Sequence, residues 1–137
     1  MKIKIILSLC LFIIFLPIVG FAQTPFIYPA PDGIITSPFG DRVHPITGNT
    51  RFHAGIDIGY DYGTPIQSAA DGIIRYYGPA DGFGNAIVVW HPKLNMGTLY
   101  GDVELIQGLH EGQEVYQGDV IGIISPVGDS TGGHLHF

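Results

Sequence analysis

The sequence predicts an all-β domain: an antiparallel β-sandwich or open sheet joined by tight hairpins. Two observations favour this fold class. No amphipathic helical repeat follows residue 23, and short β-branched and aromatic runs are separated by Gly, Pro, Asp and Asn roughly every eight to twelve residues. No repeat of fixed period and no low-complexity linker interrupts this part of the sequence, so a single domain is expected.

The predicted strands follow in order along the chain. Each is a short run rich in β-branched or aromatic residues and bounded by turn-forming residues. Turns are expected at 80–85 and 91–95, and residues 110–119 are expected to form a loop that leads into a strand. The predicted strands are 33–37, 55–59, 64–69, 72–78, 85–91, 97–102, 119–125 and 134–137.

The N-terminus has the pattern of a secretory signal peptide. Lys2 and Lys4 precede an uncharged apolar run, and Gly20 and Ala22 occupy the −3 and −1 positions of a small-residue cleavage site. We expect residues 1–22 to be removed and the protein to be secreted, with no stable membrane insertion afterwards; a retained anchor is the alternative. Residues 23–33 are expected to form an extended, Pro-rich lead-in to a domain over 34–137.

Composition after residue 22 excludes some classes of function. Four basic residues remain against twelve acidic ones, which disfavours nucleic-acid binding because that depends on Lys and Arg to neutralise phosphates. The only cysteine, Cys10, lies within the predicted signal peptide. Disulfides and thiol chemistry are therefore not expected after cleavage, and any metal ligands would be His, Asp or Glu.

The first candidate site is FHAGIDIG, residues 52–59. His53 and Asp57 are four residues apart, and positions i and i+4 share a face on an extended strand. An imidazole and a carboxylate that converge in this way suit Zn²⁺ or a similar divalent ion. A His–Asp hydrogen bond at a strand edge is an equal alternative at this point.

The second candidate site is HLHF, residues 134–137. On a strand, His134 and His136 point to one side, while Leu135 and Phe137 point to the other side, toward a core. Two imidazoles that face one cavity are costly unless their nitrogens have partners, and a metal ion supplies one. A polar strand face exposed to water is the alternative.

Taken together, the two motifs offer three metal ligands and a further histidine. A catalytic zinc site holds three protein ligands and keeps a fourth position open for water. His53, Asp57 and His136 would bind the ion, and His134 would act as general base toward that water.

The motifs resemble peptidase family M23, the zinc metallopeptidases of the LytM and lysostaphin type. The segments SPFGDRVHPITGNTRFHAGIDIG and STGGHLHF carry the resemblance, together with the glycine-rich stretches GTPIQSAADGII and EGQEVYQGDVIG, from about Ile34 to Phe137. The family implies zinc bound by His53, Asp57 and His136, a catalytic His134, and an antiparallel sheet with an open groove. It also implies hydrolysis of peptide bonds in peptidoglycan stems or cross-bridges, in the periplasm, cell wall or extracellular space. Non-catalytic LytM-type relatives that bind the wall or activate a cell-wall amidase are the alternative.

One position departs from the family pattern. Active members usually carry a further catalytic histidine in a segment like Y-x-H-L, whereas this chain reads LYGDVELI and places Asp102 there. A carboxylate can act as a base or position water, but an ionised one cannot donate to an oxyanion. We therefore expect attenuated activity. His91 and His110 are not expected to replace the missing histidine.

Two expectations concern the rim of the site and the end of the chain. Arg42 and His44, in GDRVHP, are candidates for binding a substrate carboxylate; a structural loop role is the alternative. Family members continue beyond H-x-H-F, so we expect this chain to be incomplete at its C-terminus, with an unpaired edge at the last strand.

Overall fold

The computed structural model describes residues 25–43, 48–125 and 132–137. The described part is all-β and antiparallel, as predicted, and no helix there is long and apolar enough to cross a membrane. Its strands are β1 (Ile34–Ser37), β2 (Gly40–Val43), β3 (Thr50–His53), β4 (Asp57–Gly59), β5 (Pro65–Gln67), β6 (Gly72–Ala80), β7 (Gly84–His91), β8 (Met96–Gly101), β9 (Val103–Leu105), β10 (Glu114–Val115), β11 (Val120–Ile124) and β12 (His134–His136).

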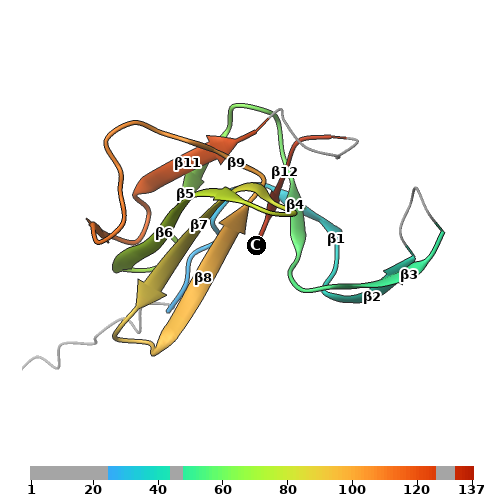
Figure 1. Cartoon of the computed structure of the whole chain (residues 1–137), viewed down its shortest axis with the longest axis horizontal. Helices are drawn as coiled ribbons and strands as arrows, with labels where there is room; N and C mark the ends of the chain where they lie inside the picture. Colours follow the sequence, from blue (N-terminus) through green and yellow to red (C-terminus); the bar gives the residue numbers. More distant parts are fainter. Residues whose placement is uncertain (1–24, 44–47, 126–131) are drawn as a thin grey trace, which may run out of the picture.

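The strands form three sheets. A seven-stranded sheet has the order β1-β4-β12-β8-β7-β6-β10, a three-stranded sheet has the order β5-β11-β9, and β2 and β3 form a hairpin. Figure 1 shows the hairpin projecting from one end of the large sheet, beside β1 and β4. This projection places the hairpin next to the edge of the sheet from which the site is built.

The core lies between the large sheet and the three-stranded sheet. Ile87 and Tyr100 from the large sheet are fully buried, as are Ile66 and Ile121 from the smaller sheet, and all belong to one apolar cluster. Side chains of one face alternate inward along each strand, so the opposite face of β4 and β12 is free to present polar groups.

The lead-in is attached to the core rather than free. Residues 25–33 form no strand, but the Ile27 N–H donates to the Ala69 carbonyl and the Gln67 N–H donates to the Pro29 carbonyl, both at 2.8 Å. Phe26 packs against the core cluster. The predicted signal peptide, residues 1–22, lies outside the described residues.

The expectation of an unpaired edge at the last strand is wrong. β12 pairs with β4 on one side through His134↔Gly59, Leu135↔Ile58 and His136↔Asp57. On the other side His136 pairs with Gly101 of β8. β12 is thus an interior strand of the large sheet, and the backbone that carries His136 is held from both sides.

Candidate metal centre

His53 ends β3, and its ring is fixed by a backbone contact. The ring Nδ1 lies 2.9 Å from the Pro38 carbonyl, which can only accept, so Nδ1 carries the proton. The lone pair of Nε2 is then directed into the site. This outer hydrogen bond sets the tautomer and orientation that a metal-binding histidine needs.

Asp57 and His136 face each other across neighbouring strands. Asp57 opens β4, His136 lies on β12, and the two are Cα partners in the ladder. Gly55 makes the close approach possible, because a Cβ there would lie 2.6 Å from the Phe137 carbonyl oxygen and 2.7 Å from His136 Nε2. Any other residue at this position would displace the His136 ring.

The three predicted ligands converge on one point. His53 Nε2 lies 3.0 Å from His136 Nδ1, and each of these nitrogens lies 3.1 Å from Asp57 Oδ1. His53 and Asp57 are only 5% and 8% exposed. Because His53 carries its proton on Nδ1, His53 Nε2 and Asp57 Oδ1 are both acceptors. The one proton available to them is the proton that His136 Nδ1 can carry.

A divalent cation fits this arrangement. Ligand atoms about 2.0–2.1 Å from a tetrahedral zinc ion lie roughly 3.3 Å from one another, close to the spacing seen here. Two nitrogens and one carboxylate oxygen also match the ligand preference of zinc. Among the described residues this is the group of His, Cys, Asp and Glu side chains that could hold a metal ion.

His53 and Asp57 do not converge in the way the sequence suggested. The prediction placed them on one extended or gently bent strand, whereas they belong to separate strands, β3 and β4. The chain bends at Ala54 and Gly55, and this bend brings the two side chains together. The ligand pair therefore also joins the projecting hairpin to the large sheet.

Arg42 holds the second carboxylate oxygen of Asp57. Arg42 Nη1 donates to Asp57 Oδ2 at 3.1 Å and to Ser37 Oγ at 2.5 Å. Burial alone would raise the pKa of Asp57, but the hydrogen bond with His136 and the nearby His53, His134 and Arg42 charges lower it below its ordinary value. Asp57 is thus kept ionised, with Oδ1 facing the ring nitrogens of His53 and His136.

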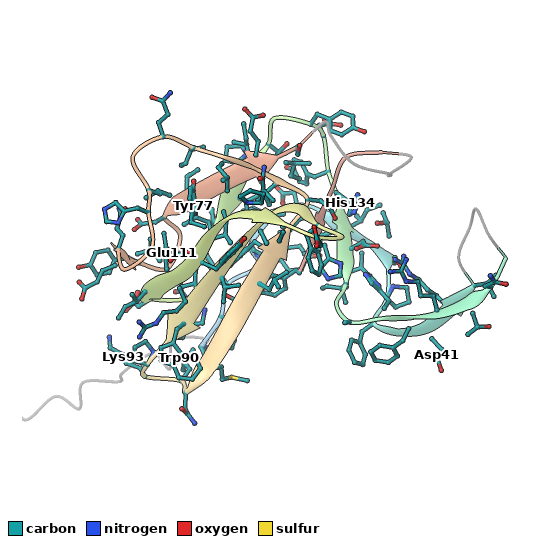
Figure 2. The ribbon with its side chains drawn as sticks, in the orientation of Figure 1. Asp41, Tyr77, Trp90, Lys93, Glu111 and His134 are labelled. Atoms are coloured by element: carbon teal, nitrogen blue, oxygen red, sulfur yellow. The ribbon has the colours of Figure 1, made fainter. Side chains whose placement is uncertain are left out.

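His134 lies beside the three ligands and interacts with Asp102. Its Nε2 donates to Asp102 Oδ2 at 3.2 Å and lies 3.9 Å from Asp57 Oδ1. The hydrogen bond with Asp102 is the main reason that the pKa of His134 is raised above its ordinary value, with burial acting in the opposite direction. Figure 2 shows His134 at the junction between the large sheet and the hairpin.

Asp102 reaches this position from a turn. It follows β8 directly, with a left-handed backbone (φ 59°) that Asp tolerates better than most residues. Its N–H donates to the Phe83 carbonyl, and its own carbonyl accepts from the Ser125 N–H. The structure therefore places Asp102 against His134.

The site opens into a groove of about 310 Å³. Its lining includes five residues that the sequence analysis named as site candidates: Arg42, Asp57, Asp102, His134 and His136. Arg51, Asp81 and Phe83 also line the groove and were not named as candidates. The Phe83 ring packs against the His136 ring with centroids 5.0 Å apart. No local motif marked these residues, because the β6–β7 turn and the hairpin meet only in the folded chain.

The other two histidines that the structure describes, His91 and His110, are separate from the site. His91 is fully buried and is hydrogen-bonded to the Asp71 carbonyl and to Thr98 Oγ1, whereas His110 Nδ1 contacts the Glu111 carbonyl in an exposed loop. Neither replaces the histidine expected at position 102. His44, a predicted substrate contact, lies outside the described residues.

Comparison with known proteins gives one consistent result. The profile of peptidase family M23 matches residues 51–137, which include all three predicted metal ligands. The DD-carboxypeptidase/endopeptidase Mpg of Neisseria meningitidis serogroup B is 41% identical over 118 residues, 86% of this chain and 26% of that protein. The peptidoglycan DD-endopeptidase ShyC of Vibrio cholerae is 33% identical over 96 residues, 70% of this chain and 22% of that protein.

Solved structures agree with the sequence matches. A zinc-containing peptidase from Vibrio cholerae superposes with a TM-score of 0.70 at 33% identity, over 82% of this chain and 36% of that one. The chain spans about a quarter of the length of the curated relatives it matches. Fold, ligand geometry and sequence similarity lead to the same conclusion: the chain belongs to peptidase family M23.

Proposed function

We propose that this protein is a zinc-dependent endopeptidase that hydrolyses peptide bonds in the stems or cross-bridges of bacterial peptidoglycan. The observation that carries the proposal is the convergence of His53 Nε2, His136 Nδ1 and Asp57 Oδ1 at mutual distances of 3.0–3.1 Å. The relatives named for peptidoglycan and peptide-bond chemistry support the choice of substrate.

The residues have separable roles in this proposal. His53, Asp57 and His136 would hold one zinc ion, which supplies Lewis-acid polarisation and a lowered water pKa when bound. Arg42 keeps Asp57 ionised and oriented. His134 carries a proton on Nε2 toward the groove, and Asp102 accepts it in a hydrogen bond, so this pair can hold or move a proton beside the substrate.

The cellular location is part of the proposal. The signal-peptide pattern of residues 1–22 supports export, with cleavage after Ala22, to the periplasm, the cell wall or the medium. A peptidoglycan substrate is reached only by an exported enzyme, so the two inferences support each other from independent parts of the sequence.

A non-catalytic module that binds the wall or activates an amidase is the second candidate. One observation favours it: Asp102 occupies the position of an expected catalytic histidine and engages His134. The complete ligand set opposes it, because a binding module does not need three converging metal ligands. We therefore place an enzyme of attenuated activity ahead of a binding module.

Hydrolysis of peptidoglycan tests the proposal. The purified, zinc-loaded protein is incubated with isolated peptidoglycan, and newly released amino groups are quantified with and without a chelator. We expect release that the chelator abolishes and added zinc restores, and no release by His136→Ala. A protein that holds one zinc ion yet releases no amino groups from several wall types would contradict the enzyme proposal.

A further inference from the structure

Two arginines lie side by side on the hairpin face that bears a metal ligand. Arg42 of β2 and Arg51 of β3 are Cα partners, and His53 follows Arg51 by two residues on the same face. Like charges at directly opposed strand positions repel each other and destabilise a hairpin. Among the described residues Asp57 offsets this repulsion, and of the two arginines it pairs with Arg42 only.

The concentration of charge is unusual for this chain. Only four basic residues follow residue 22, against twelve acidic ones, and two of the four lie here. The other two are outside the groove: Lys93 pairs with Asp71 at 3.3 Å, and Arg75 is exposed on β6. Half of the basic residues that follow residue 22 are thus placed at one end of the groove.

The two arginines differ in their partners. Arg42 donates to Asp57 and Ser37, so its charge is used in supporting the metal ligand. Arg51 is exposed, lines the groove, and has no acidic partner among the described residues. Asp41 cannot serve, because it opposes Phe52 and lies on the other face of the hairpin.

The two walls of the groove therefore carry opposite charges. The arginines lie on its hairpin wall, and Asp81 and Asp102 lie on the wall formed by the β6–β7 turn and the end of β8. The metal ligands lie between these walls. A bound peptide with a carboxylate on the hairpin side matches this distribution of charge.

We propose that Arg51 binds a free carboxylate on the residue next to the scissile bond and so selects carboxylate-bearing wall peptides over amidated ones. The inference rests on the proposed hydrolysis of wall peptides. Arg51 and His53 are two positions apart on an extended strand, so their Cα atoms are about 7 Å apart, comparable with the distance from a reacting carbonyl to the side chain of an adjacent residue. The planar guanidinium recognises a carboxylate through paired hydrogen bonds, which a carboxamide cannot match because it is neutral and has only one oxygen.

A matched pair of substrates tests the proposal. One is a cross-linked peptide dimer with a free carboxylate on the residue next to the scissile bond, and the other is the same dimer with that group as a carboxamide. We expect the zinc-loaded protein to prefer the carboxylate form in kcat/KM by about tenfold, as loss of one charge-assisted contact predicts. Arg51→Gln should reduce this ratio to about one, Arg51→Lys should retain part of it, and Arg75→Gln should leave it unchanged.

The ratio separates this proposal from the function on which it rests. Equal cleavage of both dimers by the wild-type protein, or an unchanged ratio in Arg51→Gln with normal zinc content, would overturn the role of Arg51 and leave the endopeptidase intact. If the zinc-loaded protein cleaves neither dimer and releases no amino groups from several wall types, the endopeptidase proposal fails. Arg51 is then judged by calorimetric binding of the two dimers: tighter binding of the carboxylate form, lost in Arg51→Gln, supports its role, and equal or no binding overturns it.

Discussion

Two groups of shielded histidines, His91 in the large sheet and the pair His53 and His136 where the hairpin meets that sheet, differ in how their ring nitrogens are satisfied. His91, on β7, has a partner for each nitrogen: the Asp71 carbonyl at 2.9 Å and Thr98 Oγ1 at 2.8 Å. His53 and His136 instead direct nitrogens at each other and at Asp57 Oδ1. In Figure 2, Trp90 and Lys93, which flank the His91 region in sequence, lie at the far end of the sheet from His134.

The comparison teaches that burial does not distinguish a functional histidine from a structural one. All three rings are shielded, and His91 is the most buried of them. The difference is whether each ring nitrogen has its own hydrogen-bond partner, as in His91, or whether several acceptors face one proton, as at His53, Asp57 and His136. A completed network stabilises the fold without a ligand, whereas converging lone pairs are satisfied only when a cation joins them. The two groups should therefore respond oppositely to metal and to mutation.

The largest expected effect is the loss of zinc from His136→Ala. Removing one of three protein ligands should weaken zinc binding by more than about 100-fold, which is more than the loss of a residue hydrogen-bonded to a ligand costs. Hydrolysis should fall with the zinc content. Zinc content and amino-group release measure this. Thr98→Val, in the His91 network, is the control and should retain one zinc ion; equal zinc loss in both variants would contradict the comparison.

The converse effect is on stability. Thr98→Val preserves volume but removes the hydroxyl that is hydrogen-bonded to His91 and lies 3.0 Å from the Tyr100 hydroxyl. The Tyr100 hydroxyl keeps the Ala69 N–H, but buried His91 Nε2 loses its partner, which should lower the free energy of unfolding by about 1–3 kcal/mol. Denaturant unfolding of the metal-free protein measures this, and an unchanged midpoint would show that the network is not structural.

The sequence predicts some of the strands that carry these histidines better than others. The long β-branched runs at 72–78 and 85–91 correctly predict β6 and β7, because alternation and turn residues agree there. The hairpin β2–β3 was missed because its strands are mostly exposed and polar, without an alternating apolar pattern. Short strands of this kind are defined by pairing rather than by composition.

The site shows the same division. Motif spacing predicted His53, Asp57 and His136 as metal ligands, and the structure brings these three side chains together. The spacing did not predict that His53 Nε2 and His136 Nδ1 face each other, since the Pro38 carbonyl and the β4–β12 register decide this. Arg51 carried no signal, because in sequence it is one charged residue beside an aromatic one. Its significance depends on its pairing with Arg42 across the hairpin.

A third experiment changes the residue that distinguishes this site from the family pattern. Asp102→His replaces an acceptor beside His134 with a group that can also donate to a developing oxyanion. We expect hydrolysis of peptidoglycan to increase by about tenfold, a fraction of the 10²–10³ that such donors contribute elsewhere. No gain, with zinc still bound, would favour the wall-binding module over the attenuated enzyme.

The smallest effect should appear at alkaline pH and belongs to the His91 network. Burial is the main reason that the pKa of Tyr100 is raised above its ordinary value of about 10, against the hydrogen bonds from Ala69 and Thr98. A raised folded-state pKa means that this contribution to stability is complete below pH 10 and is lost as the pH rises through the folded-state value. Unfolding midpoints measured from pH 8 to 11 should fall more steeply for the wild type than for Tyr100→Phe; parallel curves would contradict this.

The most direct test follows the histidine ring nitrogens by NMR while zinc is added to the metal-free protein. With one equivalent of zinc, we expect large ¹⁵N shifts at His53 Nε2 and His136 Nδ1, with His91 unchanged at both nitrogens. Zinc that binds without shifting those two nitrogens, or that shifts the nitrogens of His91 instead, would contradict the assignment of the metal centre.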